Sequence, residues 1–257
     1  MILHKHLRIF ILLLILLIVA LGNWATNNRA TDWSHSLRVV IYPINGDQTK
    51  VTEDYIQSLD EENFNAIKPF FIEELENYGI TSADPIDIAL SSPVKEQPPK
   101  IPVQGNIFEV VLWSLKLRYW ALQRDEYQGP KPEIQVFTLY FDPKTTPAVR
   151  HSTGLEKGHI AVINLFANEK QNNSNQFIIT HELLHTLGAS DKYNLATNEP
   201  IYPNGYAEPQ LDPIYPQSLA EVMGGRIPLS QDRSEIPASL RDVIIGEQTA
   251  KEIRLIK

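Results

Sequence analysis

Cysteine is absent from the 257-residue chain. This absence excludes disulfide scaffolds, thiolate zinc sites and cysteine nucleophiles. Basic residues are also scarce, because 23 lysines and arginines stand against 31 acidic residues and leave a formal net charge of −8. Proteins that bind nucleic acid usually carry a basic excess or a basic patch, and the sequence contains no lysine- or arginine-rich run. We therefore expect no nucleic-acid partner.

An apolar run of full membrane-spanning length is lacking as well. The run IFILLLILLIVAL covers residues 9–21, which is shorter than the roughly 20 residues that a span prefers. It follows the basic Lys5 and Arg8, as in a secretory signal, although a tilted span in a locally thinned bilayer would also fit. Residues 1–22 are therefore predicted to be either a cleaved signal peptide or an N-terminal membrane anchor. The rest of the chain is expected outside the cytoplasmic membrane, either anchored and facing the periplasm or exterior, or secreted.

The remaining chain is predicted to form one main domain, residues 37–257, after a polar tether over residues 23–36. Hydrophobic residues make up 43% of the sequence, which is enough for a sizeable core. Runs rich in β-branched residues or with alternating polarity predict four strands, at residues 37–41, 85–90, 133–141 and 159–166.

Helical patterns lie between and after these strands. Apolar spacing predicts a helix over residues 60–78, interrupted at Pro69 and ended by Gly79. Asn106, followed three positions later by Glu109, starts a strongly apolar helix whose Trp113, Leu117 and Trp120 are expected in the core. One or two short helices are expected over residues 237–256. The alternation predicts an α/β (α+β) fold, a mixed twisted sheet covered by helices.

The segment from residue 180, THELLHTLGASDKYN, contains the chemistry. A helix capped by Ser174 or Asn175 would place His181 and His185 one turn apart on the same face, where two imidazoles can bind one zinc ion. Glu182 would point to the side of the pair, as a general base requires. The pattern therefore favours a metal site over an ordinary solvated helix.

Gly188 and Asp191 extend the motif to HExxHxxGxxD. Gly188 can adopt positive φ, so the helix can end there and the chain can turn sharply. That turn would bring the Asp191 carboxylate back toward the two histidines as a third ligand. Because a carboxylate cancels one unit of the zinc charge, such a site should polarise its water less than a three-histidine site.

This motif resembles that of the metzincin metalloproteases, HExxHxxGxxH, with aspartate at the third ligand as in the snapalysin-like branch. The stretch AEVMGGR provides a candidate Met-turn, with Met223 thirty-two residues after Asp191. The resemblance covers about 45 residues. It implies a metzincin-like domain with an active-site helix, a Met-turn and a C-terminal helix. It further implies bound Zn²⁺, and a strand at residues 159–166 that forms the edge lining the substrate cleft.

Several other residues could also act as the third ligand or line the cleft. His151 and His159 compete with Asp191 as third ligand. Glu208 and Glu221 would serve if the site were of the gluzincin type, and the separate aspartate segment of aspzincins is absent. Four tyrosines between the motif and the Met-turn are candidate oxyanion or cleft residues: Tyr193, Tyr202, Tyr206 and Tyr215.

The sequence thus predicts a zinc-dependent endopeptidase that hydrolyses protein or peptide substrates with a metal-activated water. Its partners would be that substrate and, if residues 1–22 are not cleaved, the membrane. Two rivals remain: a membrane-tethered scaffold with a structural zinc ion, and a metal-free exported domain. A Glu182→Gln variant that keeps zinc but loses hydrolysis would separate the enzyme from the scaffold.

Overall fold

The computed structural model describes residues 29–102, 106–150, 152–156 and 158–256, together with Phe10, Leu13 and Leu14. Apart from those three residues, the predicted signal or anchor lies outside the described residues. The strands are β1 (Leu37–Asn45), β2 (Ile86–Leu90), β3 (Ile134–Phe141), β4 (Thr153–Leu155), β5 (Ile160–Phe166), β6 (Ala220–Glu221), β7 (Ile227–Ser230), β8 (Arg233–Glu235) and β9 (Val243–Ile244). The α-helices are α2 (Lys50–Gln57), α3 (Ile67–Asn77), α4 (Ile107–Gln123), α5 (Asn172–Thr186) and α6 (Glu247–Glu252), and the 3₁₀ helices are η1 (Glu61–Phe64), η2 (Glu169–Gln171) and η3 (Leu240–Asp242).

The central sheet has five strands in the order β2-β1-β3-β5-β4. Strands β2, β1, β3 and β5 run parallel, and β4 joins β5 antiparallel. This arrangement confirms the predicted α/β class with a mixed sheet. The prediction that residues 159–166 form the edge is wrong, because β4 pairs with the outer side of β5 and becomes the terminal strand itself.

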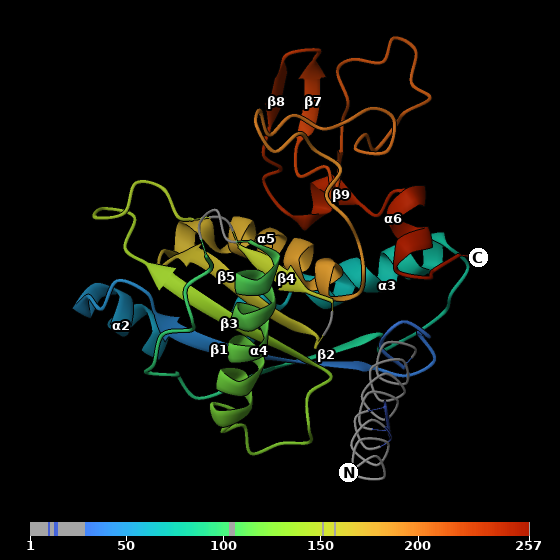
Figure 1. Cartoon of the computed structure of the whole chain (residues 1–257). Helices are drawn as coiled ribbons and strands as arrows, with labels where there is room; N and C mark the ends of the chain where they lie inside the picture. Colours follow the sequence, from blue (N-terminus) through green and yellow to red (C-terminus); the bar gives the residue numbers. More distant parts are fainter. Residues whose placement is uncertain are drawn as a thin grey trace.

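Helices cover both faces of the sheet (Figure 1). On one face, residues of α3 and α5 share a core cluster with alternate residues of the strands, such as Val39, Ile41 and Val136. On the other face, α4 packs on the intervening strand residues, including Tyr42 and Phe137. This alternation follows from the two-residue period of a strand, which sends successive side chains to opposite faces.

Strand β1 is longer than its β-branched residues predict, because it passes through Pro43. A proline lacks the N–H that a sheet ladder needs and would be expected to end an internal strand. The last register pair of β1 with β2 joins Ile41 and Leu90, so no β2 partner stands opposite Pro43. On the other side, the pairing with β3 continues to Asn45.

The predicted helix over residues 60–78 is divided into η1 and α3, with Pro69 in the first turn of α3. Gly79 follows the end of α3 with φ of +77°, as its predicted role as a helix stop requires. Helix α4 begins with the predicted capping box between Asn106 and Glu109. Of the three α4 residues expected in the core, Trp113 and Leu117 are buried between the helix and the sheet, whereas Trp120 is half-buried.

Within the predicted polar tether, the residues from Arg29 onward pack on the domain. The ring of Trp33 is buried, stacks on Phe71, and donates a hydrogen bond of 2.9 Å to the carbonyl of Ile253. Among the described residues, no helix has both the length and the apolar character needed to cross a bilayer.

After residue 191 the chain forms long loops with short strands, which extend beyond the sheet at the top of Figure 1. Two small sheets, β6 with β9 and β7 with β8, organise this region. The helices expected over residues 237–256 are η3 and α6. Helix α6 thereby returns the C-terminal part of the chain to the end of α5, where the candidate site lies.

Candidate metal centre

Helix α5 ends in a sharp turn at Gly188, whose φ is +104°. The N–H of Gly188 donates to the carbonyl of His185 at 3.2 Å, and the N–H of Ala189 donates to that of Leu184 at 3.0 Å. This pair of bonds is a Schellman motif, which satisfies the last carbonyls of the helix and requires a left-handed residue such as glycine. The turn predicted from the glycine is therefore present.

The start of α5 differs from the sequence expectation. The helix begins at Asn172, and its N-cap, Gln171, makes no capping side-chain bond. The prediction that Ser174 or Asn175 caps the helix is wrong. The amide of Asn175 instead donates to the carbonyl of Phe166 at 3.0 Å, which holds the first turn of α5 against the end of β5.

Three potential ligand atoms converge after this turn. The Nε2 atoms of His181 and His185 lie 3.1 Å apart. Oδ1 of Asp191 lies 3.2 Å from the first of these nitrogens and 3.1 Å from the second. A tetrahedral zinc ion with bonds of 2.0–2.1 Å holds its ligands about 3.3 Å apart. The residues present therefore fit a single zinc ion.

Each imidazole is held by its second nitrogen. Nδ1 of His181 lies 2.9 Å from the carbonyl of Val222, and Nδ1 of His185 lies 2.8 Å from the carbonyl of Ala189. A carbonyl accepts a hydrogen bond, so it selects the tautomer that carries its proton on Nδ1. That tautomer leaves the Nε2 lone pair directed at the common point, as a metal ligand requires.

Glu182 stands beside the histidine pair. A carboxylate oxygen of Glu182 and one nitrogen from each histidine lie within 4.8 Å of one another. The residue is only 7% exposed, and its Oε2 atom has no hydrogen-bond partner among the described residues. Burial raises the pKa of the carboxyl group, partly offset by both histidines and by a hydrogen bond from the backbone of Gly154. A buried carboxylate with one free oxygen suits a group that takes up and returns a proton.

His181, His185 and Asp191 form a triangle of potential ligands, and the charges within this triangle favour ionised Asp191. Burial would raise the pKa of this carboxyl group, but in the metal-free chain His181 and His185 in their protonated form would donate hydrogen bonds to it and hold the pKa well below its usual range. Burial would likewise lower the pKa of His185, yet Asp191 and Glu182 raise it overall. The site thus presents negative charge in a partly buried position, which a divalent cation would neutralise.

Asp191 is carried by a turn that is fastened to α6. The carboxylate of Glu252 accepts the N–H of Ser190 at 2.9 Å and the hydroxyl of Ser190 at 2.8 Å. The ammonium group of Lys192, whose side chain is only 5% exposed, donates to Glu252 at 2.7 Å and to the carbonyl of Ser190 at 2.9 Å. The residues on both sides of Asp191 are therefore held by one carboxylate.

Met223 is fully buried at the candidate Met-turn. The preceding carbonyl, of Val222, orients His181, and the Met223 carbonyl accepts the N–H of Lys192 at 2.9 Å. The backbone of Met223 thus links the turn to the segment that carries Asp191. A role of its thioether as an apolar floor under the metal stays a prediction.

The four candidate tyrosines separate into two places. The ring centroid of Tyr193 lies 6.2 Å from that of His181. Burial raises the pKa of Tyr193 to about 12, with smaller contributions from the charges of Asp191 and Glu182 and from a hydrogen bond to Asp191. Its phenol therefore stays protonated and able to donate. The other three form a cluster of their own, in which the hydroxyls of Tyr206 and Tyr215 are 2.7 Å apart and the rings of Tyr202 and Tyr206 are 5.5 Å apart.

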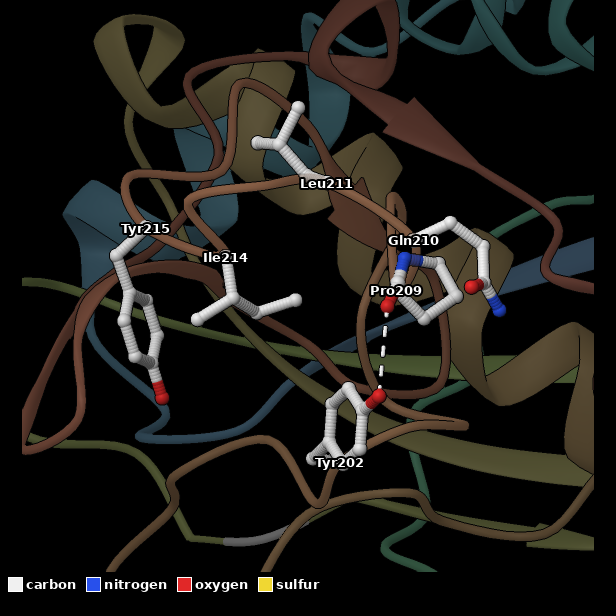
Figure 2. Close-up of a pocket in the computed structure, with 6 residues that line it drawn as sticks. All are labelled: Tyr202, Pro209, Gln210, Leu211, Ile214 and Tyr215. Carbon is white, nitrogen blue, oxygen red and sulfur yellow. Dashed lines mark hydrogen bonds between the residues drawn. The ribbon is translucent and has the colours of Figure 1, made fainter.

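That cluster borders a separate hollow of about 430 Å³, shown in Figure 2. Its lining is formed by Tyr202, Pro209, Gln210, Leu211, Ile214 and Tyr215. The Tyr202 hydroxyl lies 3.5 Å from the carbonyl of Pro209 across this hollow (Figure 2). His181, His185 and Asp191 do not line this hollow. Of the four tyrosines, Tyr193 is the one whose ring lies near His181.

The alternative ligands are placed elsewhere or lie outside the described residues. His159 is buried and its Nδ1 lies 3.0 Å from the carbonyl of Thr186, while His151 lies outside the described residues. Glu208 accepts the N–H and the hydroxyl of Ser218. Glu221 is fully buried and is bound by the backbone N–H groups of residues 224 and 246 and by a hydroxyl at position 249. These contacts leave Asp191 as the third ligand that the geometry favours.

Gly154 of β4 is a site residue that sequence reasoning missed. A Cβ atom at this position would stand 2.5 Å from the carbonyl oxygen of Glu182 and 2.6 Å from Cβ of His185. Only glycine allows the terminal strand to lie this close to α5. A three-residue strand gives almost no periodic signal, so only the closeness of the two elements identifies it.

Comparisons with known proteins add little to this geometry. No family model matches the chain, and no curated protein does. A search of solved structures finds wild-type OgpA from Akkermansia muciniphila, with a TM-score of 0.34 and 10% sequence identity, over 84% of this chain and 59% of that one. The match thus spans less than two thirds of OgpA, and at this score it carries no argument about function.

Proposed function

We propose that the chain is a zinc-dependent endopeptidase that hydrolyses peptide bonds outside the cytoplasmic membrane. The observation that carries this proposal is the triangle of His181, His185 and Asp191, in which three ligand atoms stand 3.1–3.2 Å apart beside the buried carboxylate of Glu182. The export part of the proposal rests on the basic and apolar pattern of residues 1–22.

Zinc held by this triangle would supply Lewis-acid chemistry, which polarises an amide carbonyl and makes water more acidic. Glu182 would accept the proton of the attacking water on its unpartnered Oε2 atom and pass that proton to the leaving amine. Its burial supports this role, because a raised pKa brings the carboxyl group closer to the working pH of a proton shuttle. The Tyr193 hydroxyl would donate to the oxygen on which negative charge develops.

The substrate class would be an extended peptide or protein segment. Strand β4 is the terminal strand of the sheet, and at Gly154 it touches the helical turn that carries Glu182 and His185. An extended substrate can add to such an edge through backbone hydrogen bonds, which would hold its scissile bond beside the metal. We therefore assign the substrate-binding edge to β4, and not to the strand at residues 159–166 that the sequence had suggested.

The competing function is a scaffold in which zinc is purely structural. Structural zinc sites are closed by four protein ligands, usually cysteine or histidine. The chain has no cysteine, and the triangle offers three ligand atoms with Glu182 to the side. This donor set fits a catalytic site, in which one position stays open for water, better than a structural one.

The test combines metal analysis with hydrolysis. The full chain should contain one zinc ion per molecule and should cleave an unbiased peptide library, as read by mass spectrometry. Glu182→Gln should keep zinc and the circular-dichroism spectrum but lose hydrolysis by a factor on the order of 10²–10⁴. The matched control is Glu76→Gln, which changes an exposed carboxylate on α3 and should leave both properties unaltered. Stoichiometric zinc without any Glu182-dependent cleavage would favour the scaffold.

A further inference from the structure

Helix α4 is apolar on two opposite sides. Trp113, Leu117 and Ala121 follow one another at intervals of four residues and are buried against the sheet. A second set of apolar residues recurs at intervals of three and four: Phe108, Val111, Leu115, Tyr119 and Leu122. At 3.6 residues per turn, the second stripe lies on the side of the helix opposite to the first.

The second stripe is exposed to solvent. Its members range from 54% exposed for Leu115 to 84% for Phe108, and Ile107 and Leu112 extend it with 79% and 52%. Soluble monomers rarely expose an apolar patch beyond a few hundred Å², and a larger one usually marks a contact surface. This second stripe, called the outer stripe below, therefore implies a second apolar environment for α4.

We propose that the outer stripe of α4 rests on a lipid bilayer, as a second membrane contact in addition to the apolar N-terminal run. The first described residue of the domain, Arg29, binds Glu133 with Nε and Oε1 3.0 Å apart. Glu133 ends the connection that leads from α4 to β3. The N-terminal run thus joins the domain at the segment that follows α4.

With residues 1–22 retained as an anchor, the length of the connecting chain would keep the domain at the membrane. Eight residue steps separate Leu21, the end of the apolar run, from Arg29. Even fully extended, they reach about 28 Å. A domain of about 230 residues has a radius of gyration of about 17 Å, and hence a diameter larger than that reach. An exposed apolar stripe held so close to a bilayer can enter its interface, since interfacial helices bury their apolar face about 5–10 Å deep.

A second copy of the chain fits the stripe less well. A stable dimer needs about 800 Å² of accessible surface with complementary shape from each copy, whereas this stripe is confined to one 17-residue helix. A bilayer needs no complementary surface, and Tyr119 is a residue type that favours the membrane interface. The charge of Glu109 is engaged in capping the N–H of Asn106 at 2.9 Å.

This placement leaves the metal centre accessible. Helix α4 covers one face of the sheet, while α5, with His181 and His185, lies on the other (Figure 1). A bilayer against the outer side of α4 would therefore not cover the triangle. The membrane contact does not depend on catalysis, so loss of activity in a variant would not affect the test below.

The absence of cysteine makes the proposal directly measurable. The full chain carrying Leu115→Cys is labelled with the fluorophore NBD and reconstituted into phosphatidylcholine vesicles, with and without nitroxide-labelled lipid. Val111→Cys provides a second position on the stripe, which keeps the test valid if one label perturbs folding. The matched control is Val51→Cys on α2, whose 54% exposure equals that of Leu115 and whose helix packs on the opposite face of the sheet.

We expect nitroxide lipid to quench NBD at positions 111 and 115 at least about twofold more strongly than at position 51, because an interfacial helix places its apolar side among the acyl chains. Equal, weak quenching at all three positions would overturn the proposal. Oxidation of Leu115→Cys to a disulfide-linked dimer in high yield, without quenching by lipid, would also overturn it and assign the stripe to a second copy of the chain.

Discussion

The carboxylate of Glu252 binds the backbone N–H and the hydroxyl of Ser190, at 2.9 and 2.8 Å, across 62 positions of sequence. Ser190 directly precedes the candidate third ligand, Asp191. Helix α6 thereby fixes the turn that the Schellman motif at Gly188 begins. This contact supports the triangle from outside, in the way that partners of ligand residues commonly orient metal sites.

Removing this support should weaken metal binding. Glu252→Ala deprives Ser190 and Lys192 of their common acceptor, so we expect zinc affinity to fall about 10–100-fold. Competition with a fluorescent chelator measures this change. Glu247→Gln, which alters an exposed acidic residue of the same helix, should retain full affinity. Equal affinities for Glu252→Ala and the native chain would show that the turn is rigid without α6.

The charge of the third ligand should appear in the pH dependence of hydrolysis. In Asp191→His a neutral imidazole replaces the carboxylate, so zinc would keep more of its charge and polarise water more strongly. We expect the acid limb of the kcat/KM profile to move to lower pH in this variant. Profiles over pH 4–9, corrected for zinc occupancy, measure the shift. A limb that stays in place or moves to higher pH would contradict a direct role for Asp191 at the metal.

Gly154 should be intolerant of any side chain. In Gly154→Ala the new methyl group would overlap the backbone of Glu182 and the side chain of His185, so we expect about 1–3 kcal/mol of destabilisation together with reduced zinc binding. The control is Gly79→Ala, whose methyl group meets open space but whose positive φ is strained. It should lose about 1 kcal/mol while zinc binding stays intact. Urea unfolding and zinc titration of both variants would reveal whether the two effects separate.

Glu74 should make the stability of the fold depend on pH. Burial raises the pKa of this carboxyl group to about 7, although the Ile245 N–H and the Asn77 amide bind it. The unfolded chain releases this proton near pH 4.5, so the contribution of Glu74 to stability should be fully present below that pH and should fall as pH rises to about 7.

The fall attributable to Glu74 should reach up to about 3 kcal/mol. In Glu74→Gln this contribution disappears, so the difference in unfolding free energy between the two chains should change over pH 4.5–7 and level off above it. Urea unfolding at a series of pH values provides the measurement. A constant difference across that range would mean that Glu74 titrates normally in the folded chain.

The geometry of the site was largely predictable because most of it is local in sequence. His181, Glu182 and His185 occupy two turns of one helix, so their spacing alone places both imidazoles on one face. Gly188 has a backbone requirement that glycine meets best, and Asp191 follows after a short turn. None of these relations depends on distant parts of the chain.

Contacts between distant segments could not be predicted in the same way. Nothing near Glu252 indicates that it binds Ser190, and nothing near Gly154 indicates that it touches Glu182. Tyr193 lies beside His181, while the hydroxyls of Tyr206 and Tyr215 contact each other. No feature of the sequence distinguishes these tyrosines from one another. Loop-rich segments lack the periodicity that reveals which side chains meet.

In the fold, too, long periodic elements were predictable from the sequence and short or distant ones were not. Long periodic segments such as β3, β5 and α4 were predicted within one or two residues. Strand β4 was missed because three residues show no alternation, and its omission assigned the sheet edge to β5. The exposed stripe of α4 also escaped prediction, since apolar periodicity indicates a contact face but does not identify the contacting element.

The central claim is that one zinc ion binds His181, His185 and Asp191 and retains a position for water. Anomalous diffraction at the zinc edge, on crystals of the zinc-loaded chain, tests it most directly. We expect one peak about 2.0–2.1 Å from both Nε2 atoms and from an oxygen of Asp191, with a water molecule near Glu182. A zinc peak elsewhere, or zinc enclosed by four protein ligands at this place, would contradict the claim.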